Sequence, residues 1–185
     1  NALMILDRYR DVVPSFNDDI QGTGAVAAAG MMSALRITGS RLAEQRIVIH
    51  GAGAAGLGIA RQLRTALEAA GLDGDAGRHA IAVLDSRGLL VSDPGLREAY
   101  KRELAWDTQV AVGLGLDSDH RDLLSVVRAF KPTVLIGSSG QPGAFNQAII
   151  EAMHEHCQRP VILPFSNPTD YAEARPADLI AWTNG

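Results

Sequence analysis

The chain has 185 residues, of which 46% are apolar and 21% are charged, and its formal net charge is −4 at pH 7. These values exclude a disordered or fibrous chain and predict one globular domain with a substantial core. The seventeen basic residues are scattered among twenty-one acids, and the most apolar stretch is shorter than the roughly 20 residues that span a bilayer, so we expect neither a nucleic-acid partner nor a membrane partner.

The first part of the chain predicts two helices, a strand, a glycine turn and a further helix. Helical spacing of apolar residues, β-branched runs of strand length and glycine stop signals support these predictions. In chain order they are a short amphipathic helix in residues 1–10 that Pro14 ends, a polar turn in 16–23, a helix of small residues in 24–37 followed by Gly39, a strand in 46–50, the glycine turn in 51–56 and a helix to about residue 70.

The second part predicts three more strands, each separated by helices. In order we expect a loop in 71–79, a strand in 80–84 that ends on Asp85, helices in 94–104 and 118–130 with an undetermined segment at 107–116 between them, a strand in 133–136, a helix in 145–156, a strand in 161–165, and a last helix from Pro176 to Thr183 with Asn184 and Gly185 at its end. Short apolar strands separated by helices predict an α/β fold, a Rossmann-like, doubly wound and mostly parallel sheet in one domain.

The glycine turn has the spacing of a dinucleotide-binding loop. Gly51, Gly53 and Gly56 match G-x-G-x-x-G, in which the first glycine permits the tight turn, the second lets a pyrophosphate approach the backbone, and the third lets helix and strand pack closely. A strand precedes the turn and a helix follows it, so the helix N-terminus faces the phosphates. We favour this interpretation over a turn that only packs a helix on a sheet.

An acid is expected at the end of the second strand, where it binds the adenosine ribose. Asp85 has that position. It follows Gly51 at more than the usual interval of about 20 residues, and the loop at 71–79 accounts for the excess. Ser86 and Arg87 come next, and an Arg there can pair with a 2′-phosphate. Since a solvated loop residue explains Arg87 equally well, both NAD and NADP stay open.

Two adjacent acids, Asp18 and Asp19, lie in the polar turn before the second helix. Such a pair can divide two tasks, one carboxylate binding a hard divalent cation and the other orienting a neighbouring base. Acids just before a helix are also favoured by its dipole. The spacing alone slightly favours this second interpretation, an acid pair that caps the helix.

Other polar residues give weaker signals. Asn167 follows the last strand, at the edge where parallel sheets bind ligands, but an Asn-Pro turn explains it as well. His154 and Cys157 share a helix face while His156 points elsewhere, so a solvated helix end is favoured over a metal site. His50, at the end of a buried strand, is predicted to be a core histidine with its hydrogen bonds satisfied.

Together these residues resemble the nucleotide-binding domain of malic enzymes of the larger type. The motifs that carry the resemblance cover nearly the whole chain and are F-N-D-D-I-Q-G-T (16–23), G-A-G-A-A-G-L-G-I-A (51–60), L-D-S-R-G-L (84–89), K-P-T-V-L-I-G (131–137), G-A-F (143–145) and S-N-P-T (166–169). The first and last of these are much more specific than the glycine turn. Departures occur in residues 105–120, at Gln141-Pro142 and at Asp170-Tyr171, and they leave the choice of cofactor and the shape of the loops open.

The resemblance implies oxidative decarboxylation of L-malate to pyruvate and CO₂ with NAD or NADP and Mg²⁺ or Mn²⁺. It implies that Asp19 is a metal ligand, that Asp18 is a catalytic-site carboxylate beside it, and that Asn167 contacts substrate or the nicotinamide ribose. The remaining implied cofactor contacts are Gly51, Gly53, Ala54, Ala55 and Gly56 for the pyrophosphate, and Asp85, Ser86 and Arg87 for the adenosine ribose.

The resemblance also predicts that residues 1–185 are the NAD(P)-binding domain of a longer malic enzyme, a cytoplasmic homo-oligomer when complete. The lone Cys157 agrees with a reducing cytoplasm. Since other catalytic groups of the family lie outside this segment, we expect the chain alone to bind dinucleotide without turning malate over. The alternatives are a malolactic enzyme, which releases lactate, another Rossmann-type dehydrogenase without a metal requirement, and a non-catalytic dinucleotide-binding module.

Overall fold

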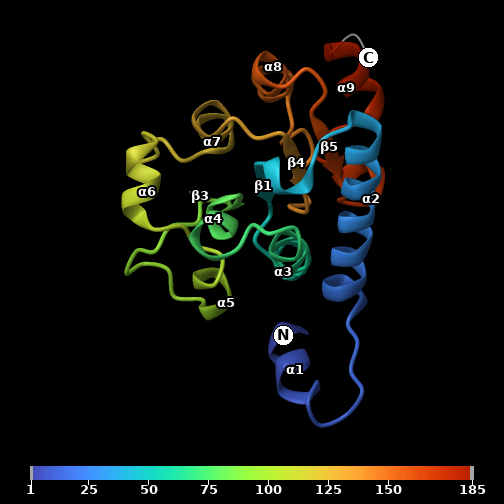
Figure 1. Ribbon diagram of the computed structural model, residues 1–185, viewed down its shortest axis with the longest axis vertical. Helices are drawn as coiled ribbons and strands as arrows, with labels where there is room; N and C mark the ends of the chain where they lie inside the picture. Colours follow the sequence, from blue (N-terminus) through green and yellow to red (C-terminus); the bar gives the residue numbers. More distant parts are fainter. Residues whose placement is uncertain (1, 184–185) are drawn as a thin grey trace.

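The computed structural model describes residues 2–183, which form a sheet with helices on both faces (Figure 1). In chain order the elements are α1 (Ala2–Tyr9), η1 (Asp18–Gly22), α2 (Thr23–Thr38), η2 (Leu42–Glu44), β1 (Ile47–His50), α3 (Ala54–Ala69), α4 (Gly74–His79), β2 (Ile81–Asp85), β3 (Gly88–Leu89), α5 (Ala99–Arg102), α6 (Thr108–Gly113), α7 (Leu123–Phe130), β4 (Val134–Gly137), α8 (Gln147–His156), β5 (Val161–Pro164), η3 (Thr169–Tyr171) and α9 (Pro176–Thr183). Within this part of the chain, no helix combines the length and the apolar character that crossing a bilayer requires.

The sheet has the order β3-β2-β1-β4-β5. β1, β2, β4 and β5 are parallel, with Ile47 opposite both Ile81 and Val134, while β3 pairs antiparallel with β2. The chain leaves β1 on one side to form β2 and later returns to the other side of β1 to form β4. This reversal is the topological switch point at which doubly wound sheets bind ligands. The predicted Rossmann-like fold is confirmed.

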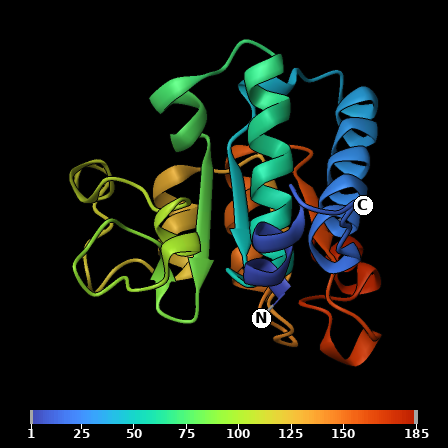
Figure 2. The same cartoon turned by 90° about the horizontal axis from the view of Figure 1, so that it is seen from below.

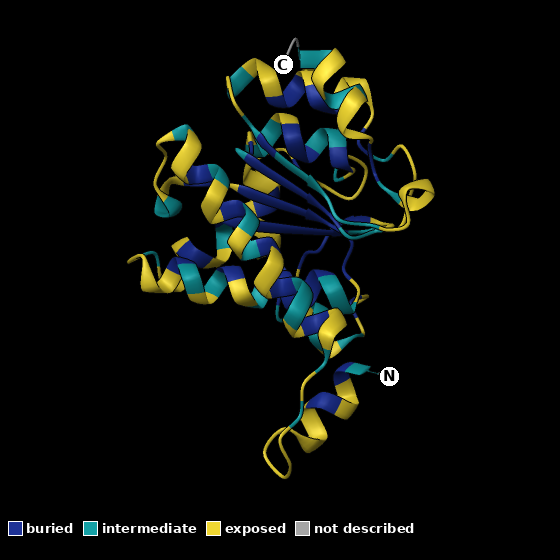
Figure 3. Cartoon of the chain, turned by 90° about the vertical axis from the view of Figure 1, so that its right-hand side faces the viewer, coloured by how far each residue is buried: buried dark blue, intermediate teal, exposed yellow. Residues whose placement is uncertain are grey.

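Two apolar cores lie on the two faces of the sheet because successive strand side chains point to opposite faces. Ile47 and Ile49 pack in the core that includes residues of α2 and α3, whereas Val48 packs with residues of α7 and α8. Figure 3 shows the central strands fully buried between these helix layers, with α1 extending from one side. Figure 2 shows α2 beside α3, and both helices start near the edge of the sheet at which the parallel strands end.

Close contact between α2 and α3 depends on two glycines. A Cβ at Gly24 would lie 2.7 Å from the carbonyl oxygen of Gly58, and a Cβ at Gly58 would lie 2.0 Å from the carbonyl oxygen of Ile20. A side chain at Gly24 would push α2 away from α3, and one at Gly58 would push η1 away from α3. Gly39 ends α2 in the left-handed conformation with φ 71°, as its position predicted.

Several predicted boundaries were wrong, mostly where an element is short. The predicted loop at 71–79 contains α4, whose Gly77 packs so tightly that a Cβ would lie 2.5 Å from the Leu72 carbonyl oxygen. The helix predicted in 94–104 is limited to α5, and the undetermined segment contains α6. The helix predicted in 118–130 starts only at Leu123, because the Asp122 carboxylate caps α7. Close packing at α4 and the side-chain cap of α7 therefore set boundaries that composition does not predict.

Two other differences concern segments that bear on the site. The predicted turn at 16–23 is instead the π-helical turn η1, whose N-cap Asn17 accepts a hydrogen bond from the Ile20 amide. The strand β3 was not predicted, because two residues carry no periodicity. Asn184 and Gly185, predicted at the end of the last helix, lie outside the described residues.

Candidate functional site

A cleft of about 320 Å³ opens where β1, β2 and β4 end. Its walls come from the glycine turn, the residues after β2, the short helix α5 and the loop after β4. The lining residues are His50, Gly51, Ala52, Gly53, Asp85, Ser86, Tyr100, Lys101, Ser138, Ser139 and Gln141. The structure therefore brings the glycine turn and Asp85 together at the switch point of the sheet.

The three glycines of the turn differ in the space around them. A Cβ at Gly51, which has φ 126°, would lie 2.5 Å from the backbone of Ser138, and a Cβ at Gly56 would lie 1.7 Å from the Gly51 carbonyl oxygen. No atom of residues 2–183 lies within 4 Å of a Cβ at Gly53, which is exposed. Gly51 and Gly56 are thus required by the fold, whereas Gly53 leaves its backbone open to a ligand.

The N-terminus of α3 faces this opening. Gly53 is the N-cap and makes no side-chain capping bond. The amides of Ala54, Ala55 and Gly56 belong to the first turn of the helix, where N–H groups have no partner within the helix. Both this set of donors and the positive end of the helix dipole favour an anion beside Gly53.

Asp85, at the end of β2, is held by two cations. Its Oδ2 accepts a hydrogen bond from Lys101 Nζ at 2.8 Å and lies 3.5 Å from the guanidinium of Arg87, and its Oδ1 accepts from the Arg87 amide at 2.8 Å. Burial alone would raise the pKa of Asp85, but these bonds outweigh it and lower the pKa. The ionised carboxylate has about four acceptor positions, so capacity remains for the hydroxyls of a ribose.

Sequence reasoning missed much of the rest of the cleft. Lys101 comes from α5, and no local pattern indicates that it reaches Asp85. Ser138 and Ser139 directly follow β4, so the rule that ligands bind at the carboxyl ends of parallel strands could have found them. Ser86 and Arg87, which were predicted, are exposed beside Asp85.

Asn167 lies outside the lining of this cleft. It is exposed in the turn after β5, where its Nδ2 donates to the Phe165 carbonyl oxygen at 3.4 Å. Because β5 is the strand next to β4, Asn167 lies at the same edge of the sheet, displaced away from Asp85. This is the direction in which a dinucleotide extends from its adenosine end.

The prediction for His50 was wrong in one respect. The residue is buried at 9% exposure, as expected, but its Nδ1 atom has no hydrogen-bond partner among residues 2–183. Its ring lies at the end of β1, 6.2 Å from the Phe145 ring. Burial lowers the pKa of His50, against the weaker raising effects of Gln141 and of the Glu173 charge.

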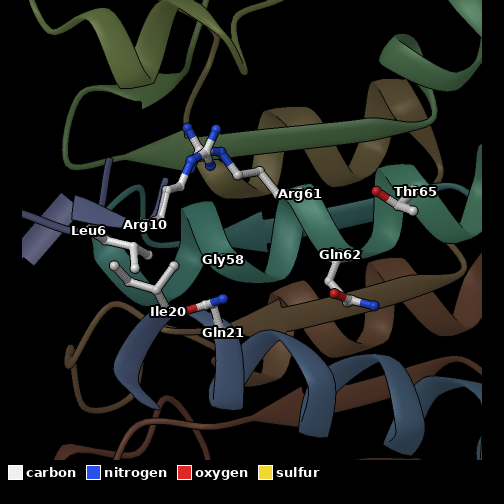
Figure 4. Close-up of a pocket in the computed structure, with 8 residues that line it drawn as sticks. All are labelled: Leu6, Arg10, Ile20, Gln21, Gly58, Arg61, Gln62 and Thr65. Carbon is white, nitrogen blue, oxygen red and sulfur yellow. The ribbon is translucent and has the colours of Figure 1, made fainter. Parts of the chain in front are cut away.

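The segment with the acid pair packs on α3 near the same edge of the sheet. Figure 4 shows Ile20 and Gln21 of η1 beside Gly58 of α3, around a pocket of about 180 Å³. Asp18 and Asp19 are exposed, and neither side chain takes part in an ion pair within the described residues. The cap of η1 is Asn17, so the acid pair lies in the first turn but does not cap the helix.

Residues 2–183 contain no cluster of three potential metal-ligating side chains of these four types: His, Cys, Asp and Glu. In particular, His154 is exposed on α8, and His156 instead contacts the Pro132 carbonyl oxygen at 2.8 Å. The acid pair would need further ligands to bind a hard cation, which takes six or more oxygens.

Comparison with known proteins finds malic enzymes among the similar proteins. Residues 20–185 match the family described as malic enzyme, NAD binding domain. NAD-dependent malic enzymes of Pectobacterium carotovorum subsp. carotovorum (strain PC1) and Edwardsiella ictaluri (strain 93-146) are 45% and 47% identical to the chain over 186 residues, covering 100% of it and 33% of each relative. The chain thus spans about a third of their length. The crystal structure of Entamoeba histolytica malic enzyme aligns with a TM-score of 0.76 at 26% identity, over 97% of this chain and 34% of that one.

Proposed function

Because the chain belongs to the malic enzyme family, in which it matches the NAD-binding domain, we propose that it binds NAD⁺ for the oxidative decarboxylation of L-malate to pyruvate and CO₂. We further propose that it is one domain of a longer, homo-oligomeric cytoplasmic enzyme. The observation that carries the proposal is the open backbone at Gly53, next to the free amides of α3. Bound NAD⁺ would accept a hydride from the carbinol carbon of malate, and the resulting β-keto acid would lose its C4 carboxylate as CO₂.

Residues in the cleft and beside it, along the same edge of the sheet, would correspond in order to the parts of NAD⁺. The amides of Ala54, Ala55 and Gly56 would bind the pyrophosphate, since they lack partners within the helix. Asp85 would accept the ribose hydroxyls at the adenosine end. Asn167 would contact the nicotinamide ribose or the substrate through its carboxamide, which both donates and accepts hydrogen bonds.

NAD⁺ is proposed over NADP⁺ on the balance of charge at Asp85. Lys101 contacts both the Asp85 carboxylate at 2.8 Å and that of Glu98 at 3.4 Å, and Arg87 lies beside Asp85. The two cations therefore already face two acids, and a 2′-phosphate would add negative charge next to an ionised carboxylate. The relatives named above are NAD-dependent enzymes, which agrees with this proposal.

That the acid pair takes part in binding a divalent cation stays a prediction. Asp19 as a ligand of Mg²⁺ or Mn²⁺, and Asp18 as the carboxylate that orients a neighbouring base, need partners beyond residues 2–183. For that reason we expect the purified chain not to reduce NAD⁺ when malate and Mg²⁺ are added. Malate-dependent formation of NADH by the chain alone would contradict this expectation.

The substitution Gly53→Ala tests the binding site without disturbing the fold. The added Cβ meets nothing within 4 Å, and Gly53 has an ordinary φ of −87°, so the free energy of unfolding should change by less than about 0.5 kcal/mol. The methyl group would cover the backbone that the pyrophosphate approaches. We expect the affinity for NAD⁺, measured by titration calorimetry, to fall at least about tenfold, which corresponds to about 1.4 kcal/mol.

Gly30→Ala is the matched control. Gly30 lies in α2, away from the cleft, and within the described part of the chain a Cβ there also meets nothing within 4 Å. The change should stabilise the helix by roughly 0.5–1 kcal/mol and leave NAD⁺ affinity unaltered. If Gly53→Ala bound NAD⁺ as tightly as the unmodified chain, the proposed pyrophosphate site would be wrong.

A further inference from the structure

Glu173 is a buried carboxylate with no role in the function proposed above. It lies between η3 and α9, and its exposed fraction is 0%. None of the ion pairs within residues 2–183 includes it. Since an unpaired buried charge is strongly unfavourable, the hydrogen bonds around Glu173 must compensate for its burial.

Those hydrogen bonds come from two different loops. Glu173 Oε1 accepts from the amide and the hydroxyl of Ser139, at 2.7 and 2.8 Å, and from the hydroxyl of Ser166 at 2.6 Å. Ser166 Oγ in turn accepts from the Gly140 amide at 2.8 Å. One carboxylate oxygen therefore joins the loop after β4 to the loop after β5.

The protein makes room for this carboxylate. β4 ends on Gly137, and a Cβ at that position would lie 2.4 Å from the carboxyl carbon of Glu173. Burial would raise the pKa of Glu173, but the hydrogen bonds from Ser166 and Ser139 outweigh it and lower the pKa. The group is therefore ionised at neutral pH, and charge-assisted bonds of this kind are roughly twice as strong as neutral ones.

The two loops lie where the second half of a dinucleotide would pass. Ser139 lines the cleft, and the neighbouring Ser138 hydroxyl donates to the Gly51 carbonyl oxygen at 3.1 Å. Ser166 directly precedes Asn167. With the adenosine end at Asp85 on β2 and the pyrophosphate over Gly53, the nicotinamide end extends toward β4 and β5, the strands that these loops follow.

We propose that Glu173 is a positioning residue for the nicotinamide half of the cofactor, because it fixes the loops after β4 and β5 to each other. The inference rests on the proposed NAD⁺ site and adds a separate element to it. The adenosine half depends on Asp85 and the glycine turn, neither of which forms a hydrogen bond with Glu173. Removing a hydrogen bond between Glu173 and these loops should therefore weaken the binding of the nicotinamide half and leave the binding of the adenosine half nearly unchanged.

The test compares NAD⁺ with ADP, which has the adenosine and the diphosphate but no nicotinamide riboside. Ser166→Ala removes one of the hydroxyls that donate to Glu173, and Glu173→Gln removes the charge of that side chain at nearly constant side-chain size. In titration calorimetry with the chain, we expect each variant to lose at least about fivefold in NAD⁺ affinity, or about 1 kcal/mol, while ADP affinity changes less than twofold. Equal losses for both ligands, or no loss for NAD⁺, would overturn the inference.

Ser125→Ala is the matched control, because it also removes a serine hydroxyl that donates to a carboxylate. Ser125 Oγ donates to Asp122 Oδ2 at 2.5 Å at the start of α7, outside the lining of the cleft. Neither the affinity for NAD⁺ nor that for ADP should change in this variant.

The failure of the proposed function would give a different result from the failure of the inference. If the unmodified chain bound neither ligand, the proposed function would be wrong. If the unmodified chain bound both ligands and the Glu173 variant bound them equally well, only the inference would be wrong.

Discussion

Two carboxylates at one edge of the sheet, Asp85 and Glu173, are held in different ways. Asp85 retains 10% side-chain exposure and faces the cations Lys101 and Arg87. Glu173 has no exposed surface, and its partners are amides and hydroxyls. The first carboxylate borders the cleft, whereas the second joins the loop after β4, which lines the cleft, to the loop after β5, which does not.

This difference in hydrogen-bond partners determines whether each carboxylate can change its contacts when a ligand binds. A lysine ammonium on a flexible stem can shift when a ligand arrives, so Asp85 can exchange part of its contact with Lys101 for ribose hydroxyls. The donors to Glu173 belong to backbone and short side chains, which cannot follow a moving carboxylate. We therefore expect substitutions at Asp85 to act mainly on ligand affinity and substitutions at Glu173 mainly on stability and on the geometry of the loops.

The largest expected effect is the loss of stability in Glu173→Ala. The change leaves the Ser139 amide and two hydroxyls without their acceptor and creates a cavity. Each buried donor that loses its acceptor costs about 1–3 kcal/mol, so for these three donors we expect a loss of at least about 3 kcal/mol in urea unfolding. Asp85→Ala should cost only about 1 kcal/mol, since Lys101 can turn its ammonium toward water.

Equal losses of stability in Glu173→Ala and Asp85→Ala would show that the two carboxylates contribute alike to the stability of the fold. Glu173→Gln sharpens the comparison, because the amide oxygen can still accept the three short bonds as a neutral group. Its loss of stability should be smaller than that of Glu173→Ala. A Gln variant as unstable as the Ala variant would show that the charge, rather than the acceptor geometry, holds the loops.

The second expected effect is a loss of NAD⁺ affinity in Asp85→Ala of at least about tenfold, or about 1.4 kcal/mol. The variant removes the acceptor for the ribose hydroxyls and leaves Lys101 and Arg87 facing the cleft with one acid fewer. For the same reason the affinity for NADP⁺ should fall less than that for NAD⁺. Calorimetric titration of both nucleotides measures the two changes together.

Asp178→Ala is the control for Asp85→Ala. Asp178 also accepts a bond from a cation, Arg175 at 2.9 Å, but this pair lies at the start of α9 outside the lining of the cleft. Exposed pairs contribute about 0–1 kcal/mol, and no effect on either nucleotide is expected. A parallel loss of NAD⁺ affinity in this variant would show that the effect of Asp85→Ala is not specific to the cleft.

The sequence predicted the glycine-turn half of the site because its signals are local. Gly51, Gly53 and Gly56 follow a β-branched strand at fixed spacing, and Asp85 ends the next apolar run, so the alternation of strands and helices predicts that they lie at one edge of a parallel sheet. The four parallel strands were confirmed for the same reason. β3 and α4 escaped prediction because their formation depends on tertiary contacts that outweigh local preference.

The other half of the site could not be predicted in this way. Lys101 and Glu173 belong to segments with no strand or motif of their own, and they reach the cleft and its supporting loops only through the folded chain. The acid pair Asp18 and Asp19 shows the opposite case. Its sequence motif is highly specific, yet the described residues give it no third ligand, so its role stays a prediction.

The smallest expected effect is a pH dependence of stability that originates from His50. The folded state lowers the pKa of His50, chiefly through burial, whereas the unfolded chain has the ordinary value of about 6.5. Between about pH 6.5 and the lower pKa of the folded state, the unfolded chain binds more protons. Stability contributed by the neutral ring is therefore fully present above pH 6.5 and is lost as the pH falls through that window.

His50→Gln tests this origin. One proton gives a slope of at most about 1.4 kcal/mol per pH unit, and urea unfolding between pH 7 and pH 5 should show a shallower slope in the variant than in the unmodified chain. His154→Gln removes an exposed histidine of α8 and serves as the control. If the two variants lost the same slope, burial at the end of β1 would not be its cause.

Because the charges near His50 include Glu173, the slope in Glu173→Gln should become steeper, since the neutral amide no longer favours the protonated ring.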